Sequence, residues 1–429
     1  MSARRPSDMK MLDWYVFAAL CLSFLTACAT HTKLTEGRPL ERETPKQGFV
    51  RGLWVRAASV AVPESIPRVM RIVESMEITD IFVQVVVGGY AYYDSGLLPR
   101  SQYLSKVSAP GYNPLDSLIK ACSTVPVRIH AWVNALLWWS LPDPPDSVNH
   151  VFHTHPDWFI NDANNRSMAE YPYDLWKSMR VEGMYLDPTR TEVADLVQDV
   201  CAEIAGRYPI DGIHLDFIRY PGILWGLPHT DQSAVFASTD VWAGSYTLTN
   251  YCCSEFRERW QAWQAWRLTR GRRWTIAGLV SAIGRRVREE AVKQPCILSC
   301  AVFADPAYSR HSFAQNWTEW PEGTYVPVIM SYTPDITRFI VYADFALRHR
   351  PDAILGIGML WPSMRDTARL QEQAAQKAHA AGVCYFDFAN LDTMTNLPDH
   401  GHDRLDSVVL DTIRWWGRTV SGAFADRPP

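Results

Sequence analysis

The 429-residue chain has no excess of basic residues, since 42 Lys and Arg stand against 46 Asp and Glu and give a net charge of −4. Proteins that bind nucleic acid usually carry a basic patch, so this balance argues against a nucleic-acid partner. The sequence also lacks zinc-type spacing of cysteine with histidine, a glycine-rich phosphate turn after the first predicted strand, and internal repeats. Its composition, 47% hydrophobic and 21% charged, suits one large barrel or two smaller domains.

The first 27 residues have the pattern of a bacterial signal peptide. A basic start precedes an apolar run from Trp14 to Leu25, which is too short to cross a bilayer comfortably as a permanent helix. The run ends in Leu25-Thr26-Ala27-Cys28, which resembles a bacterial lipobox and implies that Cys28 carries lipid in the mature protein. Several acyl chains on one residue anchor a protein durably. The alternative is a cleaved secretory signal in which Cys28 is incidental.

The sequence also indicates where the protein is anchored and how the rest of the chain is divided. By resemblance to other lipoproteins, Ala29 in place of Asp after the lipobox cysteine implies anchoring on the periplasmic face of the outer membrane, if the host has one. Residues 28–48 are polar without an apolar period and predict a tether. We expect residues 49–420 to form one barrel and residues 421–429 to form a C-terminal tail.

Seven cysteines remain beyond the signal peptide and Cys28, and their number is odd. Most lie in apolar patterns, which favours buried thiols. These cysteines are Cys122, Cys201, Cys252, Cys253, Cys296, Cys300 and Cys384.

Eight short apolar runs alternate with helical patterns from residue 51 onward. Their near-continuous apolar character is expected of parallel strands that are covered on both faces. The predicted strands are Gly52–Arg56, Ile81–Val87, Val127–Val133, Gly212–Phe217, Ile297–Phe303, Val328–Tyr332, Ile354–Met359 and Val383–Phe388. Eight such strand–helix units predict a (β/α)8 TIM barrel of the α/β class, with an open doubly wound sheet as the alternative.

Two of the predicted helices have recognisable ends. An apolar stripe from Val193 to Ile204 predicts one helix, and Thr189 and Glu192 have the spacing of a capping box at its start. A second helix is predicted over Arg365–Ala381, with Gly382 as its C-terminal glycine.

Long connections follow the third and fourth strands, at residues 135–188 and 218–250. Both leave the C-terminal ends of strands, where barrel active sites are built. Long structured loops on that face usually line a binding cleft.

The fourth strand carries the densest group of polar residues, within Asp211–Pro221. Alternation along a strand places His214 and Asp216 on one face, and in a closed barrel that face is the interior. A carboxylate in that position needs a partner, and Arg219 is the obvious one. Asp216 is therefore a candidate catalyst, with a structural Asp–Arg pair as the alternative.

Other strand ends supply the rest of a candidate site. Hydrolysis of a glycosidic bond needs two carboxyl groups across the bond, one of them protonated. The candidates to accompany Asp216 are Asp305, Glu319 and Asp335, each of which is also suited to capping a loop. We expect substrate contacts from His130, Trp132, Asn134, Trp138, His214, Arg219, Tyr220, Tyr332, Asp335, Trp361 and Asp387. The histidines lack a clear third partner ligand, so neither a metal nor another cofactor is expected.

Ten short motifs in order resemble the glycosyl-hydrolase-like 10 family of bacterial secreted or lipoprotein TIM barrels, over residues 51–390. The motifs are RGLW (51–54), VQVVVGGYAYYDSGLLPRS (83–101), YNPL (112–115), VRIHAWVN (127–134), HPDWF (155–159), EGMYLDP (182–188), DGIHLDFIRYP (211–221), AVFADP (301–306), QNWTEW (315–320) and MSYTPD (330–335). The resemblance implies a glycoside hydrolase acting on a bacterial polysaccharide such as peptidoglycan glycan strands stripped of peptides. By the same analogy Asp216 matches a retaining enzyme's nucleophile.

The sequence departs from the family pattern at two places. The run Val85–Ala91 lacks the family's Arg and Gly-Asp-Ala, and Thr324-Tyr325-Val326 stands where an Asp often leads into the sixth strand. Loss of these polar groups from the end of the barrel would change which substrate binds or would reduce activity. The alternative functions are therefore a glycan-binding lipoprotein without catalysis and an envelope scaffold recruited by protein partners.

Overall fold

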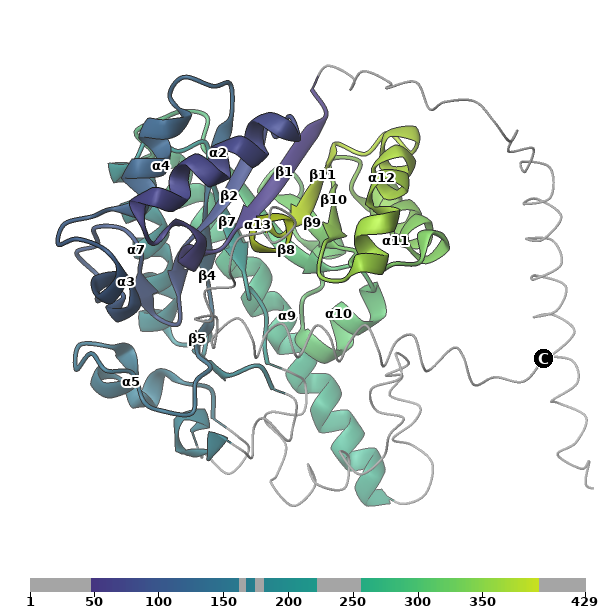
Figure 1. The fold of residues 1–429 in the computed structure, drawn as a ribbon. Coiled ribbons are helices and arrows are strands. Elements are labelled where there is room, and N and C mark those ends of the chain that lie inside the picture. Colours follow the sequence, from purple (N-terminus) through teal and green to yellow (C-terminus); the bar gives the residue numbers. More distant parts are fainter. Residues whose placement is uncertain (1–47, 162–166, 174–180, 222–255, 393–429) are drawn as a thin grey trace, which may run out of the picture. The chain divides into compact units, whose positions relative to one another are not determined.

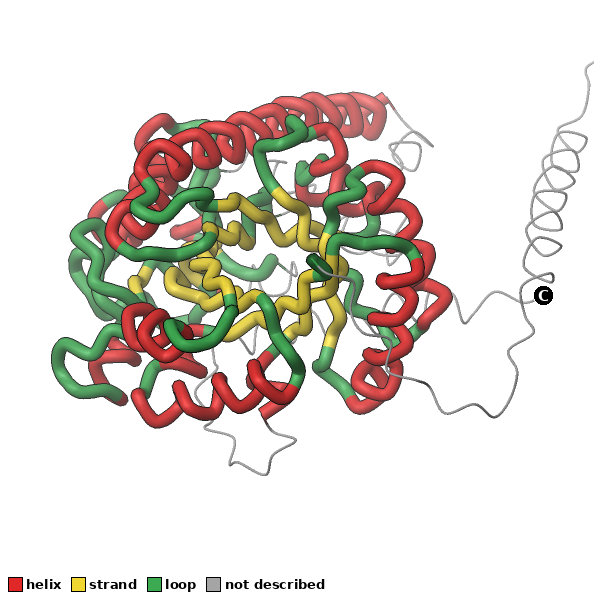
Figure 2. Tube along the Cα trace, turned by 90° about the horizontal axis from the view of Figure 1, so that it is seen from above, coloured by secondary structure: helices red, strands yellow, loops and turns green. Residues whose placement is uncertain are grey.

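The structure, a computed structural model, describes residues 48–161, 167–173, 181–221 and 256–392. Eight parallel strands close into a barrel, and Figure 2 shows this ring of strands surrounded by helices. The strands are β1 (Val50–Val55), β2 (Asp80–Val87), β4 (Arg128–Asn134), β7 (Gly212–Asp216), β8 (Ile297–Phe303), β9 (Val326–Met330), β10 (Ile354–Gly358) and β11 (Gly382–Phe386). The first strand pairs with both β11 and β2, so the ring is complete. The predicted TIM barrel is confirmed, and the doubly wound sheet is wrong.

Helices cover the outside of the barrel (Figure 1). The longer ones are α2 (Ile66–Ser75), α4 (Pro114–Cys122), α7 (Thr191–Arg207), α9 (Phe256–Glu290), α11 (Ile336–His349) and α12 (Pro362–Lys377). The short elements are α3 (Gln102–Val107), α5 (Val151–Thr154), α10 (Pro306–Phe313) and α13 (Phe388–Asp392), with strands β3 (Tyr90–Ala91), β5 (Leu137–Trp139) and β6 (Met184–Tyr185). Five 3-10 turns complete the described elements: η1 (Ala57–Val60), η2 (Pro63–Ser65), η3 (Pro156–Trp158), η4 (Met168–Glu170) and η7 (Trp317–Glu319).

Alternation along each strand separates two apolar clusters. Leu53 and Val55 of β1 pack outward with the helices, whereas Trp54 between them packs inside the barrel. On β7, Ile213 and Leu215 likewise belong to the outer cluster. The polar residues of β7 therefore face the interior, as the alternation predicted.

Two predicted helix ends differ from the structure. The N-cap of α7 is Arg190, and the Thr189 hydroxyl donates to Asp187 Oδ1 (2.7 Å), so no capping box forms with Glu192. A neighbouring carboxylate competes successfully for the capping hydroxyl.

The second helix, α12, ends at Lys377, and Gly382 is the first residue of β11. A Cβ at position 382 would clash with the Val50 carbonyl oxygen of β1. This glycine is therefore required for close strand approach and not for a helix cap.

The long third loop is fixed to the barrel by His150, which is fully buried. Its Nδ1 accepts a hydrogen bond from the Phe152 backbone N–H (3.0 Å), so Nε2 carries the proton and donates to the Gly88 carbonyl (2.8 Å). Gly88 and Gly89 have φ values of 58° and 73°, and a Cβ on Gly89 would clash with the His150 ring. The glycine pair thus allows the loop to close on the turn after β2.

Acid is expected to destabilise the protein through His150. Burial is the main reason that the pKa of His150 falls to about 4, against about 6.5 in an unfolded chain. Between these two pKa values the unfolded state binds more protons than the folded state. The contribution of His150 to the free energy of unfolding is therefore fully present above pH 6.5 and is lost as the pH falls. We expect His150 to account for a loss of about 2 kcal/mol between pH 7 and pH 5.

Urea unfolding at the two pH values measures this loss, and His150→Gln provides the comparison. The variant should show a pH dependence smaller by that amount, because Gln does not titrate. Equal pH dependence in the two proteins would rule out His150 as the source.

Candidate active site

Asp216 is the last residue of β7, at the C-terminal end of the barrel, which we call the mouth. Its side chain is 13% exposed. Its Oδ1 accepts a hydrogen bond from the Phe217 backbone N–H (2.6 Å) and lies 3.6 Å from Arg219 Nη1. Phe217 has a φ of 51°, so the chain turns sharply directly after the carboxylate. Oδ2 has no hydrogen-bond partner in the described part of the chain, and Asp216 therefore keeps one oxygen for other contacts.

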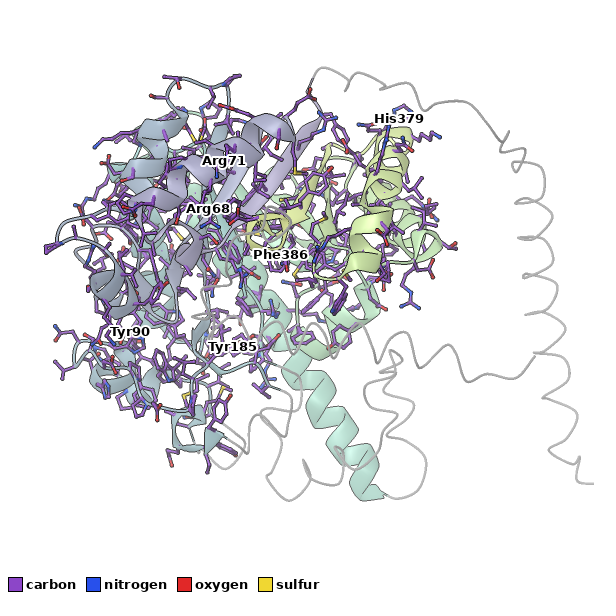
Figure 3. The ribbon with its side chains drawn as sticks, viewed as in Figure 1. Arg68, Arg71, Tyr90, Tyr185, His379 and Phe386 are labelled. Atoms are coloured by element: carbon purple, nitrogen blue, oxygen red, sulfur yellow. The ribbon has the colours of Figure 1, made fainter. Side chains whose placement is uncertain are left out.

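Arg219 lies between two carboxylates. Its Nη2 donates to Glu182 Oε1 (2.8 Å), and the Tyr185 hydroxyl donates to Glu182 Oε2 (2.6 Å). The guanidinium also lies 4.3 Å from the Phe217 ring centroid and 4.7 Å from the Phe303 centroid. All members of this cluster except Phe303 are buried, and Tyr185 is labelled in Figure 3. The cluster is thus a hydrogen-bonded group of charged side chains beside Asp216.

Burial and charge act on Asp216 in opposite directions. Burial raises the pKa of Asp216, and the nearby Glu182 carboxylate adds to the rise. Arg219 and the Phe217 N–H lower that pKa, but burial prevails. Asp216 is thus able to hold a proton at higher pH than an exposed aspartate.

His214 lies beneath the mouth, inside the barrel, and is fully buried. Trp54 Nε1 donates to His214 Nε2 (3.0 Å), so the proton of the neutral ring is on Nδ1, which contacts Ser299 Oγ (2.9 Å). Burial lowers the pKa of His214 well below its ordinary value. Both ring nitrogens of His214 therefore have hydrogen-bond partners, and one of these bonds fixes the Trp54 indole.

His130 lies deeper in the barrel. It pairs in register with Gly212, the first residue of β7, whereas Asn134 pairs with Asp216. His130 Nε2 contacts Asp80 Oδ1 (2.8 Å), and its ring stacks on Phe82 with centroids 4.6 Å apart. His130 is therefore placed for packing and a hydrogen bond with Asp80, away from the mouth.

On β4, Asn134 lies at the mouth beside Asp216, and Trp132 lies just beneath it, beside His214. Gln84 Nε2 donates to Asn134 Oδ1 (3.3 Å), which directs the Asn134 amide. The Trp132 indole N–H is buried and has no hydrogen-bond partner among the described residues. An unpaired donor in a buried position is costly unless a ligand or water accepts from it.

Tyr332 and Asp387 lie on the other side of the mouth. Tyr332 stacks on Phe386, which is labelled in Figure 3, with ring centroids 5.1 Å apart. Asp387 is fully buried and forms an ion pair with Arg56, which follows β1. Trp361 is partly buried against the same interior cluster. The structure thus brings Tyr332 and Trp361 to the aromatic lining, while the Asp387 carboxylate is occupied by Arg56.

Comparison with known proteins places this barrel in a family. The family described as Glycosyl hydrolase-like 10 matches residues 49–345. The chain belongs to the glycosyl hydrolase-like 10 family. Its predicted family is therefore confirmed, and it is a glycoside hydrolase-like protein.

Two curated relatives are similar to part of the chain. Glycosyl hydrolase YngK of Bacillus subtilis (strain 168) is 28% identical over 181 residues, covering 40% of this chain and 32% of YngK. Glycosyl hydrolase DigH of Escherichia coli (strain K12) is 24% identical over 198 residues, covering 40% of this chain and 42% of DigH. The matches thus span less than half the length of either relative.

Two solved structures share the fold. The PgaB (BpsB) glycoside hydrolase domain from Bordetella bronchiseptica has a TM-score of 0.53 at 13% identity, covering 82% of this chain and 96% of that domain. The catalytic domain of β-amylase from Paenibacillus polymyxa has a TM-score of 0.52 at 9% identity, covering 90% of this chain and all of that domain. At these identities the likeness is one of fold.

In this member of the glycosyl hydrolase-like 10 family, the three predicted partner carboxylates have other contacts. Asp305 caps α10, with Oδ1 accepting from the Tyr308 N–H (2.9 Å), and Asp335 caps α11 in an exposed position. Glu319 is exposed on η7, 3.9 Å from Arg310. Capping is the alternative that the sequence left open for all three carboxylates, and Asp305 and Asp335 have that role in the structure.

Sequence reasoning missed Glu182. It precedes β6 in the run Val181–Leu186, whose members are all buried. A lone acidic residue within a buried run is rarely left unpaired. That pattern is the signal that would have identified it as a partner of Arg219.

Most of the other aromatic residues considered lie in the core. Trp138 is 2% exposed and donates through Nε1 to the Ala135 carbonyl (3.0 Å), so it presents no open face. Tyr220 is also 2% exposed, with the Arg272 guanidinium 4.8 Å from its ring centroid. Trp317 is buried as well. These rings stabilise the loops around the mouth.

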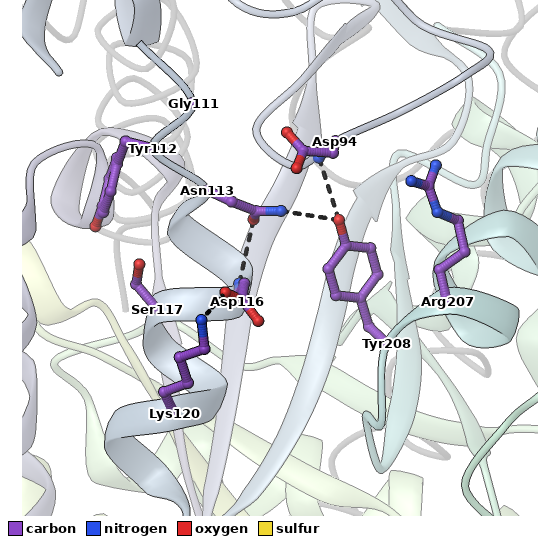
Figure 4. A pocket seen from close by; sticks show the side chains of 9 residues that line it. All are labelled: Asp94, Gly111, Tyr112, Asn113, Asp116, Ser117, Lys120, Arg207 and Tyr208. Atoms are coloured by element: carbon purple, nitrogen blue, oxygen red, sulfur yellow. Dashed lines mark hydrogen bonds and ion pairs between the residues drawn. The ribbon is translucent and has the colours of Figure 1, made fainter. Parts of the chain in front are cut away.

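A separate polar pocket of about 450 Å³ lies where α7 ends (Figure 4). The Tyr208 hydroxyl accepts from the Asp94 backbone N–H (3.2 Å) and Asn113 Nδ2 (2.9 Å). Lys120 pairs with Asp116 on the same helix. These polar groups thus have partners within the pocket, which lies on the side of the barrel where β7 begins.

The five cysteines in the described ranges are free and buried, as predicted, whereas Cys252, Cys253 and the predicted lipidation site Cys28 lie outside these ranges. Within the same ranges, no cluster of three or more His, Cys, Asp or Glu is arranged to hold a metal ion. None of the described helices has the length and apolarity needed to traverse a bilayer.

Proposed function

We propose that the protein is a lipoprotein that hydrolyses O-glycosidic bonds of a bacterial polysaccharide, such as peptidoglycan glycan strands, with Asp216 as the reacting carboxylate. The observation that carries this proposal is the position of Asp216, at the C-terminal end of a barrel strand with Oδ2 unengaged by the described residues. Barrel enzymes keep their catalytic groups at that face. Family membership supports the same reaction class.

The neighbouring groups suit a sugar chain. Asn134 lies beside Asp216 across the β4–β7 pair, and amides bind hydroxyl groups. Trp132 supplies an unpaired N–H, and Tyr332 supplies an aromatic ring. In the proposed reaction Asp216 acts on the anomeric carbon as nucleophile or stabilises its developing positive charge.

Asp305 is the proposed acid that protonates the departing oxygen. It follows β8, the strand that pairs with β7, and it is only partly buried. Its capping bond uses Oδ1 alone. The second oxygen has no hydrogen bond to the described residues and is the one that would carry the proton.

The proposed membrane attachment rests on sequence. The apolar run that ends in Leu25-Thr26-Ala27-Cys28 supports lipidation of Cys28, and the polar residues 28–48 support a tether. The proposed location is the periplasmic face of the outer membrane.

Incubation of the purified protein with peptide-free glycan strands and with intact peptidoglycan, followed by mass analysis, tests the activity. We expect soluble saccharides from the peptide-free strands, because the proposed reaction of Asp216 breaks the glycosidic bonds that join their sugars. Binding to the strands without release of fragments would instead support the glycan-binding alternative. The capping contacts of Asp305 and Asp335 favour that second function.

A further inference from the structure

The two contacts of Arg219 in the mouth are unequal. Arg219 donates to Glu182 at 2.8 Å, whereas its distance to Asp216 is 3.6 Å. The first is a charge-assisted hydrogen bond, and the second is an ion pair without one. Arg219 is therefore bound chiefly by the carboxylate that is remote in sequence.

We propose that Glu182 is a positioning residue, which binds Arg219 and thereby prevents the guanidinium from closing on Asp216. The proposal rests on the proposed function of Asp216 and adds a residue to it. Glu182 lies outside the set of residues that the sequence predicted for the site.

The contacts of Glu182 are those of a fixed group. Both of its oxygens are engaged, Oε1 by Arg219 and Oε2 by Tyr185, and the side chain is 7% exposed. Tyr185 itself is fully buried. A carboxylate with two short contacts and little solvent access holds its partner in one place.

Loss of Glu182 would leave the Arg219 charge with Asp216 as its remaining carboxylate in the described part of the mouth. A buried cation moves toward the anion that remains, because an uncompensated buried charge is costly. Arg219 would then bind Asp216 closely and compete with the substrate for its oxygens. Glu182 thus keeps Asp216 available.

The same change has an electrostatic consequence. Among the described residues, the charged or titratable groups that act on Asp216 are Arg219 on its own loop, Glu182 and Tyr185 at β6, and Tyr332 after β9. Glu182 raises the pKa of Asp216 and Arg219 lowers it. Replacing Glu182 with a neutral residue removes the first effect and strengthens the second. Asp216 should then titrate at lower pH.

Glu182→Gln tests the proposal through the pH profile of glycan hydrolysis. We expect kcat to fall by about 10- to 100-fold, since small displacements of a reacting group have effects of this order, with a smaller change in KM. The limb of the profile that belongs to Asp216 should move to lower pH. A profile unchanged in position and height would overturn the proposal.

Glu203→Gln is the matched control, because Glu203 also holds a loop but lies outside the mouth. Its carboxylate accepts from the Tyr93 hydroxyl (2.8 Å) and the Gly96 N–H (2.6 Å). This variant should keep the wild-type profile.

Tyr185→Phe covers the case in which Glu182→Gln does not fold, since it removes one hydrogen bond to Glu182 and leaves every charge in place. Its kcat should fall severalfold with little shift in pH, and a wild-type kcat would overturn the proposal.

Carbodiimide labelling of Asp216 followed by peptide mass analysis gives a readout that needs no activity, since carbodiimide reacts with the protonated carboxyl. The pH midpoint of labelling should be lower in Glu182→Gln than in the wild-type protein. A shifted midpoint in a protein that hydrolyses no glycan would leave this inference standing and reject the proposed function. Glycan hydrolysis by the wild-type protein, together with equal labelling midpoints in the wild-type protein and Glu182→Gln, would support the proposed function and reject this inference.

Discussion

Replacement of Asp216 by asparagine is expected to lower kcat on glycan strands by 10²- to 10⁴-fold, the order that a positioned acid, base or nucleophile contributes. Asparagine has the same shape and still accepts from the Phe217 N–H, but it can neither ionise nor attack the sugar. Arg219 keeps Glu182 as its closer partner, so the fold should persist. Steady-state kinetics and a thermal melt of the same sample measure the two effects.

The control lies at the opposite end of the same strand. Asp211 precedes β7, accepts from the Ile129 N–H (2.9 Å) and pairs with Lys293 (2.7 Å). Asp211→Asn should therefore affect stability and not kcat. Full activity of Asp216→Asn would contradict the assignment of Asp216.

Replacement of Asp387 by alanine is expected to destabilise the protein by about 3 to 5 kcal/mol. The Asp387 carboxylate is fully buried and Arg56 is 5% exposed. Removal of the carboxylate leaves the Arg56 charge in the interior without that anion, which is the costly way to break a buried ion pair. Urea unfolding followed by circular dichroism measures the change in free energy.

Two further variants separate charge from packing. Arg56→Met combined with Asp387→Ala removes both charges and should recover part of the loss. Arg348→Ala breaks the exposed pair with Asp344, and it should change stability by less than about 1 kcal/mol. A loss for Asp387→Ala as small as that for Arg348→Ala would refute the role of the buried pair.

The barrel was predictable because its strands are buried on both faces. Continuous apolar runs such as Ile297–Phe303, when helical patterns separate them, are typical of parallel strands with helices on one side and a packed interior on the other. Period-two alternation then placed His214 and Asp216 inside the ring. These inferences depend on local chain geometry, which is why they needed no knowledge of distant contacts.

The contacts across the mouth were not predictable in the same way. Arg219 was assigned to Asp216 because the two are neighbours in sequence, yet its short hydrogen bond goes to Glu182 in a different loop. Gly382 was assigned to a helix end, although its role is to make room for β1. A sequence records which residue is small or charged, but the partner that makes this necessary comes from the fold.

The closure of the ring by its first and last strands also bears on how the protein is made. Val50 of β1 pairs with Gly382 of β11, so the backbone groups on that side of β1 stay unsatisfied until nearly the whole barrel has been synthesised. A chain that stops before β11 would present two open edges, on β1 and β10, to which other chains can add. Premature termination late in the barrel would therefore produce a species prone to self-association, and not a shorter folded barrel.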